Sequence, residues 1–170
     1  MLAIILATGP SMSQAIANSV RGKGTVIAVS DSYKLAPWAD ILVSSDAAWW
    51  RFHKPEFAGR KLSGVPVHGI ELAEGVVSGS NSGLIALQVA VNLGAKKVLL
   101  CGYDMGGTHF FGPHPDGLKN TAPKRFEVFK KQFENYKPKG IEILNCTQGS
   151  ALRAYPMARL EDYLQLKVFS

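Results

Sequence analysis

The sequence lacks several features that would place it in a well-defined class at once. It has only two cysteines, Cys101 and Cys146, and neither has a second Cys or a His at the spacing of zinc ligands, so no metal site is expected. Both are predicted to be reduced, buried thiols at strand ends. No apolar run is long enough to cross a bilayer. The apolar start, 2–7, has no basic leader and is interpreted as a strand, so we expect a cytoplasmic protein without a membrane partner.

The two common phosphate-binding fingerprints are missing as well. The chain contains neither Gly-x-Gly-x-x-Gly nor Gly-x-x-x-x-Gly-Lys-Ser/Thr, which argues against a standard dinucleotide site and against a P-loop. No internal repeat, linker or low-complexity segment divides the 170 residues. A chain of this length suits one domain with a well-filled core, so residues 1–170 are interpreted as a single domain.

Acidic residues are in the minority, with 13 Asp and Glu against 19 Lys and Arg and a formal net charge of +6. Much of the excess lies between Lys119 and Lys139, where seven basic residues accompany only two glutamates. Three phenylalanines of this segment recur at helical spacing and predict an apolar face. The charges are therefore expected on the solvated opposite face, and an anion-binding or nucleic-acid-binding surface is the alternative.

Apolar runs alternate with helical patterns along the whole chain. Strands are expected at 2–7, 25–29, 41–44, 98–101 and 141–146, with a short edge strand at 65–68 because Pro66 bars a central position. Helices are expected at 11–20, capped by Ser11 or Ser13, and at 47–53, 84–94, 121–136 and 157–166, whereas 54–61 and 106–123 are expected to be loops. The alternation predicts an α/β fold with a single Rossmann-like, doubly wound, mostly parallel sheet of about five to six strands and helices on both faces.

Small or polar turns follow the predicted strands. They are Thr8–Ser11, Ser30–Asp31, Ser45–Asp46, Gly102–Asp104 and Asn145–Ser150. Because the carboxyl ends of parallel strands meet at one edge of a sheet, these turns predict a ligand crevice. Asp31 lies where nucleotide-binding folds place an acid against a ribose hydroxyl, although a helix cap or turn role is the alternative.

A Ser/Gly loop, 78–83, precedes the apolar helix at 84–94. Backbone N–H groups at a helix N-terminus stabilise anions, so Ser80, Asn81, Ser82 and Gly83 are candidate phosphate-binding residues. Serines that only cap the helix are the alternative interpretation.

Two aromatic or histidine-bearing segments complete the candidates. The loop at 106–123 is long and rich in Gly, Pro and His, as functional loops often are. Its His109 and His114 are candidates for proton transfer. The aromatic residues Trp49, Trp50 and Phe52 are interpreted as core packing, with base stacking or an apolar patch for a homo-oligomer as alternatives.

Several motifs together resemble a known family. Gly9-Pro10-Ser11-Met12 resembles the Gly-Pro-Ser-Leu signature of the family 42 bacterial sialyltransferases. The related DUF115 proteins, which include archaeal 6-hydroxymethylpterin diphosphokinases, share that signature. The likeness continues in Ser82-Gly83 and its helix, in the strand that ends at Gly102-Tyr103-Asp104, and in the segment 145–152. The ordered set covers most of the chain.

The resemblance implies a nucleotide or nucleotide-sugar bound across the strand ends. Carried over by position, the binding residues are Gly9, Pro10, Ser11, Asp31, Ser45, Ser82, Gly83 and Asp104. The strand-end turns and the Ser/Gly loop add Asp46, Ser80, Asn81, Gly102, Asn145 and Ser150.

The resemblance also implies a general base in the loop after the Gly-x-Asp strand. His109 and His114 both lie there, and His114 is preferred because it precedes the basic helix. Asp104 would orient the histidine or the ribose. No cofactor is assigned, although diphosphate transfer would require Mg²⁺, with Asp46 or Asp104 as ligand.

The chain departs from the sialyltransferases in two respects. It is much shorter, without room for their acceptor-binding lid, and Asp31 replaces the asparagine of their second strand. Compact relatives occur in phage genomes, so a viral source is one implication.

Three functions therefore follow as hypotheses. The first is a nucleotide-dependent transferase that moves a sugar or a diphosphate. The second is a nucleotide-binding module without turnover, acting as a sensor or sponge. The third is nucleic-acid binding through the basic segment 119–139.

Overall fold

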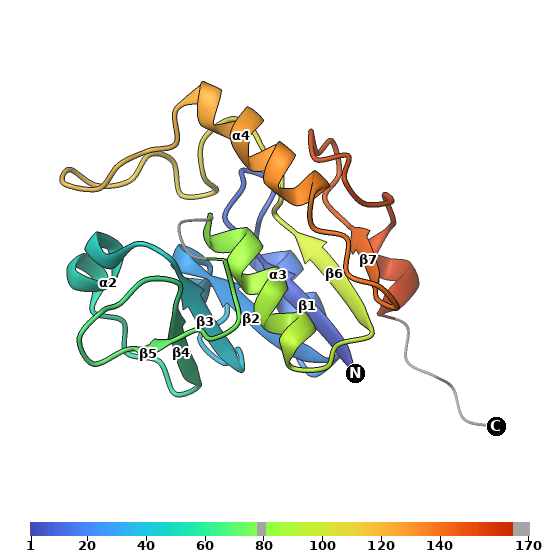
Figure 1. Ribbon diagram of the computed structural model, residues 1–170, viewed down its shortest axis with the longest axis horizontal. Coiled ribbons are helices and arrows are strands. Elements are labelled where there is room, and N and C mark those ends of the chain that lie inside the picture. The colour runs from blue at the N-terminus through green and yellow to red at the C-terminus, as the bar shows by residue number, and fades with distance from the viewer. Residues whose placement is uncertain (78–80, 165–170) are drawn as a thin grey trace.

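A single parallel sheet forms the centre of the molecule (Figure 1). The computed structural model describes residues 1–77 and 81–164. The seven strands of the sheet are arranged in the order β5-β4-β3-β2-β1-β6-β7, and every neighbouring pair is parallel. They are β1 Leu2–Leu6, β2 Thr25–Val29, β3 Ile41–Ser44, β4 Arg60–Ser63, β5 Glu71–Leu72, β6 Lys97–Cys101 and β7 Glu142–Asn145.

The helices connect these strands and cover both faces of the sheet. They are α1 Gln14–Val20, α2 Ala47–His53, α3 Ser82–Asn92 and α4 Pro123–Glu134, with short 3-10 turns η1 Ser30–Lys34 and η2 Leu160–Tyr163. The Rossmann-like α/β fold is therefore confirmed, with a larger sheet than the five or six strands expected. Within the described ranges, no helix has the length and apolarity needed to span a bilayer.

Alternate residues of β1 supply two separate cores. Ala3 and Ile5 pack with α3 on one face, whereas Ile4 and Leu6 pack with α1 and α2 on the other. Side chains of the neighbouring central strands belong to both cores. These strands are buried on both faces, so their sequences are uninterrupted apolar runs.

The order of the strands places a switch point at the centre of the sheet. The chain moves outward from β1 through β2 to β5, and then returns through α3 to β6 on the other side of β1. Adjacent helices diverge at such a point, and ligands of open α/β sheets bind there, outside the carboxyl ends of the strands. In Figure 1, α4 crosses this edge of the sheet.

The prediction for the edge of the sheet was wrong. The segment 54–61 is not all loop, because Arg60 and Lys61 begin β4. The segment 65–68 is not a strand and contributes only an isolated bridge between Val67 and Ile70. Only Leu62 and Ser63 of β4 are buried, and β5 is exposed, so these strands lack the uninterrupted apolar run that revealed the central strands.

The expected helix at 157–166 is also wrong over the residues described. Only the turn η2 is helical there, and residues 165–170 lie outside the described part of the chain. Before η2 the chain runs beside β7, where Asn145 N–H donates to the Pro156 carbonyl and Ala158 N–H donates to the Asn145 carbonyl. These two hydrogen bonds form an isolated parallel bridge between Met157 and Asn145, in place of helical bonds.

Other boundaries follow from local capping. Ser13, and not Ser11, caps α1, because its hydroxyl accepts a hydrogen bond from Ile16 N–H. Core packing of the tryptophans is confirmed, since Trp49 and Trp50 are 2% and 3% exposed. An oligomer patch built on these two tryptophans is therefore wrong, and only Phe52 of the three aromatic residues is exposed.

Candidate functional site

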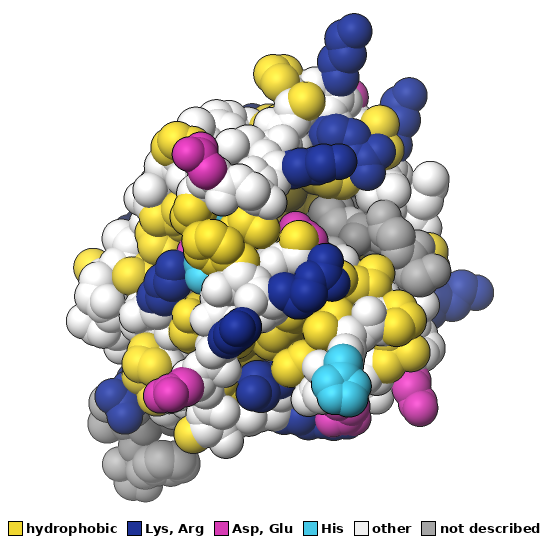
Figure 2. Space-filling view, turned by 90° about the vertical axis from the view of Figure 1, so that its left-hand side faces the viewer, with side chains coloured by type: hydrophobic (Ala, Val, Ile, Leu, Met, Phe, Trp, Pro, Cys, Tyr) yellow, Lys and Arg dark blue, Asp and Glu magenta, His cyan; other side chains and the backbone are white. Residues whose placement is uncertain are grey.

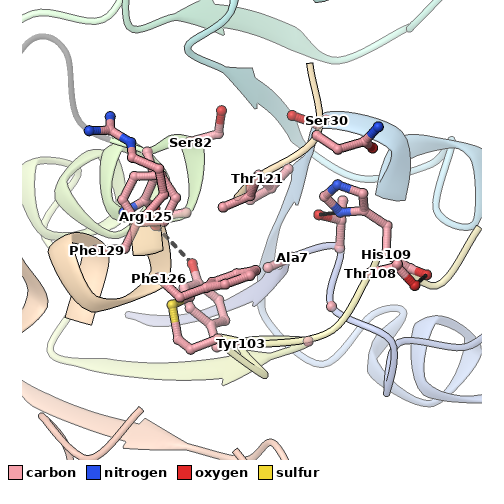
Figure 3. Close-up of a pocket in the computed structure, with 18 of the residues that line it drawn as sticks. Ala7, Ser30, Ser82, Tyr103, Thr108, His109, Thr121, Arg125, Phe126 and Phe129 are labelled. Carbon is pink, nitrogen blue, oxygen red and sulfur yellow. Dashed lines mark hydrogen bonds between the residues drawn. The ribbon is translucent and has the colours of Figure 1, made fainter. Parts of the chain in front are cut away.

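The carboxyl ends of the central strands open into a cavity of about 490 Å³ (Figure 3). This volume is in the range of small-molecule sites. The turns after β1, β2, β3 and β6 form one side, together with the first turn of α3. The opposite side is formed by the loop at 105–122 and by α4. The predicted site residues that line this strand-end cavity are Gly9, Ser45, Asp46, Asn81, Ser82, Gly83, Gly102, His109 and His114.

The turn after β1 is held by Asp104. The hydroxyl of Ser11 donates to Asp104 Oδ1 at 2.8 Å, and Ser11 N–H donates to Oδ2 at 3.2 Å. Gly9 N–H donates to the Gly102 carbonyl at 2.8 Å. A Cβ on Gly9 would lie 2.0 Å from Asp104 Oδ1, so only glycine fits. Asp104, Pro10 and Ser11 therefore shape the cavity wall and are not among the described residues that line it.

The first turn of α3 is fixed from two sides. Ser45 N–H donates to the Ser82 hydroxyl at 2.9 Å, and the Tyr103 hydroxyl donates to the Gly83 carbonyl at 2.8 Å. Asn81 caps the helix, because its Oδ1 accepts from Leu84 N–H. First-turn N–H groups have no acceptor within a helix and carry its positive dipole end, so this wall is suited to an anion. Ser80, predicted for the same role, lies outside the described residues.

Two residues of the cavity have a strained backbone. Ser30 and Met105 have φ values of 46° and 56°, in the left-handed region that non-glycine residues rarely occupy. Such conformations cost on the order of 1–3 kcal/mol and cluster at functional sites. Only one other described non-glycine residue, Lys54, shares this feature. The sequence carries no sign of this strain.

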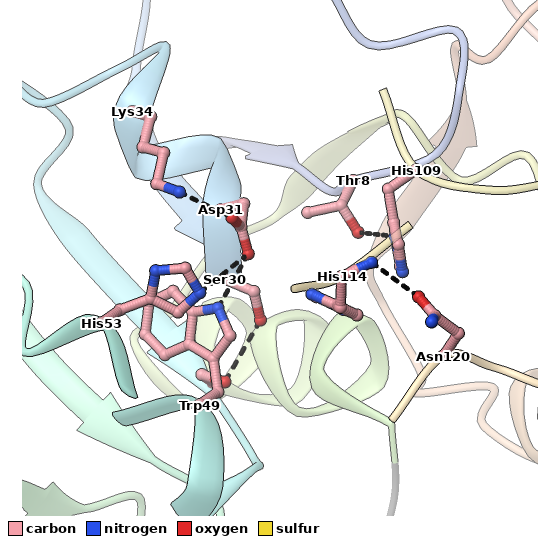
Figure 4. A network of polar contacts seen from close by, with 10 residues as sticks. Thr8, Ser30, Asp31, Lys34, Trp49, His53, His109, His114 and Asn120 are labelled. Atoms are coloured by element: carbon pink, nitrogen blue, oxygen red, sulfur yellow. Dashed lines mark hydrogen bonds and ion pairs between the residues drawn. The ribbon is translucent and has the colours of Figure 1, made fainter. Parts of the chain in front are cut away.

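His109 and His114 lie side by side on the loop wall, with ring centroids 4.4 Å apart (Figure 4). His109 stacks on Phe111, and its Nδ1 lies 3.1 Å from the Thr8 hydroxyl. Burial lowers the pKa of His109, and the nearby His114 lowers it further. Backbone N–H of His114 donates to Asn120 Oδ1 at 2.7 Å. Its Nδ1 is buried without a hydrogen-bond partner among the described residues.

Asp31 is 1% exposed and is directed into the protein (Figure 4). Burial tends to raise its pKa, but hydrogen bonds from Trp49 and Lys34 outweigh burial and hold the pKa below its usual range. Trp49 Nε1 donates to Oδ1 at 2.8 Å, and Lys34 Nζ to Oδ2 at 2.9 Å. Both oxygens are thus engaged within the protein, and Asp31 is not among the described lining residues.

His53 borders the same carboxylate. Its Nε2 lies 3.7 Å from Asp31 Oδ1, close enough for an ion pair if the ring were charged. Burial is the main influence on the pKa of His53 and lowers it, although Asp31 opposes this change. The imidazole is therefore neutral near pH 7.

Asn145 and Ser150 are fully buried at the end of β7 and are not among the described lining residues. Asn145 Nδ2 donates to the Ser150 hydroxyl at 3.0 Å, and that hydroxyl donates to the Tyr103 carbonyl at 2.5 Å. Both side chains hold the 147–152 turn against the end of β6. Their contacts are structural.

Sequence reasoning missed most of the wall formed by α4. Phe126 and Phe129 line the cavity, and only Phe133 of this apolar face is in the core. The Arg125 guanidinium lies 5.2 Å from the centroid of the Phe129 ring. Lys119 is the second basic lining residue. The only sequence signal that these residues belong to the site was their position directly after the histidine-bearing loop.

No metal centre is visible within residues 1–77 and 81–164, where no group of three or more His, Cys, Asp or Glu side chains is gathered around one point. Cys101 and Cys146 are free buried thiols, as expected. Burial raises the pKa of Cys146 to about 11, so the thiol is protonated and a poor metal ligand near neutral pH.

Comparison of the chain with protein-family models, with curated proteins and with solved structures found no match.

Proposed function

We propose that the chain binds a nucleotide or nucleotide-sugar in the strand-end cavity and transfers a sugar or a diphosphate from it to an acceptor hydroxyl. One observation carries the proposal: a helix N-terminus, two aromatic rings and two basic side chains line the same cavity. The first turn of α3 would hold the phosphates. Phe126 and Phe129 offer faces for a base, and Lys119 and Arg125 offer charges for the phosphates.

Two buried polar atoms support a polar ligand. Asn81 Nδ2 and His114 Nδ1 have no hydrogen-bond partner among the described residues, and both side chains line the cavity. Buried polar groups in native proteins are nearly always hydrogen-bonded. A ligand with both acceptor and donor groups would satisfy these two atoms together.

The proposed reaction uses His114 as the general base. Its imidazole would accept the proton of the acceptor hydroxyl while that oxygen forms a bond to the transferred sugar carbon or phosphorus. The bond to the nucleotide breaks in the same step, and its electron pair remains on the departing phosphate oxygen. The α3 N-terminus and Arg125 would stabilise that charge. Burial lowers the pKa of His109, so this neighbour is neutral and places no positive charge beside His114.

Diphosphate transfer would need Mg²⁺, which is commonly held by one or two carboxylates and the substrate phosphates. Asp46 fits this role, because it lines the cavity and only its Oδ1 is used, to cap α2 at Ala48 N–H. Asp104 does not fit, because both of its oxygens accept from Ser11.

A binding module without turnover is the second candidate, and the position of Asp104 favours it. Histidine bases are usually oriented by a carboxylate, but Asp104 holds the turn after β1 instead. Across the described ranges, no carboxylate is hydrogen-bonded to His109 or His114.

The binding proposal is tested with nucleotides and nucleotide-sugars in a thermal-shift screen, followed by calorimetry. Arg125→Gln should weaken the affinity by about tenfold or more, because a charge-assisted hydrogen bond is lost. Lys124→Gln is the matched control, since it removes the same charge from the preceding residue of α4, which does not line the cavity. No stabilisation by any of these ligands at millimolar concentration would refute the proposal.

Turnover is tested separately. Mass spectrometry of ligand extracted from denatured protein would find an intact nucleotide for a module and a product for a transferase.

Nucleic-acid binding through the basic segment 119–139 is tested by a salt titration. If that segment binds nucleic acid, the affinity for an oligonucleotide falls steeply with salt.

A further inference from the structure

A second pocket, of about 420 Å³, lies on the side of the molecule that carries α2 and β5. It is formed by the C-terminal end of α2, by β4 and by the tight turn at 67–70. Its lining residues, which define the basic pocket, are Trp50, Arg51, Lys54, Pro55, Lys61, Val67, His68 and Ile70. None of them lines the strand-end cavity.

The bottom of the basic pocket is apolar and rigid. The Nε1 of Trp50 donates a hydrogen bond to the Ser44 carbonyl at 3.0 Å. Its ring also packs edge-on against Trp49, with the two ring centroids 5.1 Å apart. Pro55, Val67 and Ile70 complete this apolar surface. A fixed aromatic edge among small apolar groups suits a flat apolar molecule.

The rim of the basic pocket carries positive charge that no acidic side chain of the described residues pairs with. Arg51, Lys54 and Lys61 form no ion pair within the described residues, and no acidic residue lines the pocket. Figure 2 shows Lys and Arg side chains around hydrophobic surface on this face. By contrast, Arg60, the neighbour of Lys61 in β4, donates to Glu71 Oε1 at 2.9 Å. The sequence thus neutralises one cation of β4 and leaves the other unpaired beside the pocket.

Lys54 adds a second, independent observation. It ends α2 with φ 42° and ψ 56°, a left-handed conformation in which glycine is strongly preferred. A lysine there costs about 1 kcal/mol relative to an unstrained residue. The other two described non-glycine residues with positive φ, Ser30 and Met105, both line the strand-end cavity. The strain therefore places a cation, and not a glycine, beside the pocket, which supports a role for its charge.

We propose that the basic pocket is a second ligand site, for a small organic phosphate whose anionic group is attached to a flat apolar body. The phosphate would contact Lys54, Lys61 and Arg51, and the apolar body would pack on the side of Trp50 that borders the pocket. Three cations that line one pocket favour a dianion over a monoanion. Binding would relieve the mutual repulsion of the cations.

Phenyl phosphate is the probe for this site, measured by titration calorimetry and by amide chemical-shift changes at Ile70 and Lys61. It should bind more tightly than either inorganic phosphate, which has the anion alone, or phenol, which has the apolar body alone. Lys61→Gln should weaken the affinity by about threefold to fivefold, the effect of one partly exposed ion pair. Equal affinities of phenyl phosphate and inorganic phosphate would overturn the proposal.

Two control variants distinguish binding in the basic pocket from a diffuse charge effect and from binding in the strand-end cavity. Arg60→Gln changes the net charge as Lys61→Gln does, and should leave the affinity unchanged because Arg60 does not line the pocket. Equal losses in the two variants would show a diffuse electrostatic effect and overturn the proposal. Arg125→Gln, which alters only the strand-end cavity, should also have no effect. A loss in Arg125→Gln alone would place phenyl phosphate in the other cavity and likewise overturn it.

Lys54→Gly gives a readout that misfolding cannot imitate. Glycine relieves the left-handed strain, so the variant should melt at a higher temperature than the parent protein. Its affinity for phenyl phosphate should nevertheless fall about threefold to fivefold, because one cation is lost. A stabilised variant with unchanged affinity would overturn the role of Lys54 and, with it, the proposed site.

Discussion

Replacing Gly9 with alanine tests the arrangement that shapes the strand-end cavity. A Cβ at this position would lie 2.0 Å from Asp104 Oδ1 and 2.5 Å from the Gly102 carbonyl oxygen. Neither atom can withdraw easily. Oδ1 accepts the Ser11 hydroxyl, and the carbonyl accepts Gly9 N–H. Asp104 Oδ1 would have to retreat by about 1 Å to reach a tolerable contact.

The cost follows from those contacts. Overpacking at a well-packed position costs about 1–3 kcal/mol. A weakened hydrogen bond between Ser11 and the carboxylate adds about 1 kcal/mol, so we expect Gly9→Ala to lose about 2–4 kcal/mol. For a chain of this length, the melting temperature should fall by roughly 5–15 °C. The turn after β1 would also move, so affinity for a nucleotide in the cavity should fall with stability.

Urea denaturation and thermal melting measure the loss, with Gly106→Ala as the matched control. Gly106 lines the same cavity, but a Cβ there would meet no atom within 4 Å. Its stability should change by less than about 0.5 kcal/mol. In an Asp104→Ala background the cost of Gly9→Ala should shrink but not vanish, because the Gly102 carbonyl remains. A Gly9→Ala protein as stable as Gly106→Ala would refute the reasoning.

Three other outcomes are expected. Because burial lowers the pKa of His53 and His109 in the folded protein, the unfolded chain takes up protons first as the pH falls below about 6.5. The urea midpoint should therefore be constant above that pH and decrease below it, and the decrease should be smaller in His53→Gln. A urea midpoint that does not change with pH would contradict this. The double variant of His109 and His114 to alanine should lower any transfer rate by about 10²–10⁴, while nucleotide affinity changes much less. Full activity would exclude the general base. Gly83→Val should weaken nucleotide binding and also lower the melting temperature, since a Cβ at this position would lie 3.0 Å from the Tyr103 ring. Ser82→Val should have the same two effects, because the hydrogen bond from Ser45 N–H is lost. Unchanged binding in both variants would exclude this wall as the phosphate site.

The central strands could be predicted because burial on both faces leaves an uninterrupted apolar run. The edge could not, since β4 begins with Arg60 and Lys61, which no apolar pattern marks. Arg60 is instead joined across the sheet to Glu71 of β5, eleven residues later. A pairing of this kind is a tertiary contact, and local periodicity does not contain it.

The near wall of the cavity could be predicted for a topological reason. Turns at the carboxyl ends of parallel strands must meet at one edge, whatever their individual sequences. The far wall depends on how α4 docks, and the helical pattern fixed only that its phenylalanines share one face. Docking places Phe133 in the core and leaves Phe126 and Phe129 over the cavity.

The two acids expected at the ligand, Asp31 and Asp104, form structural contacts instead. Other side chains therefore determine the charge of the cavity. Asp31 forms an ion pair with Lys34 and accepts a hydrogen bond from Trp49, whereas Asp104 accepts hydrogen bonds from Ser11. The charged side chains among the described residues that line the cavity are Asp46, Lys119 and Arg125, so the net charge of the lining is positive. The dipole of α3 adds to that charge. The cavity is therefore electrostatically suited to an anionic ligand, and a bound cation would require the phosphates of that ligand as partners.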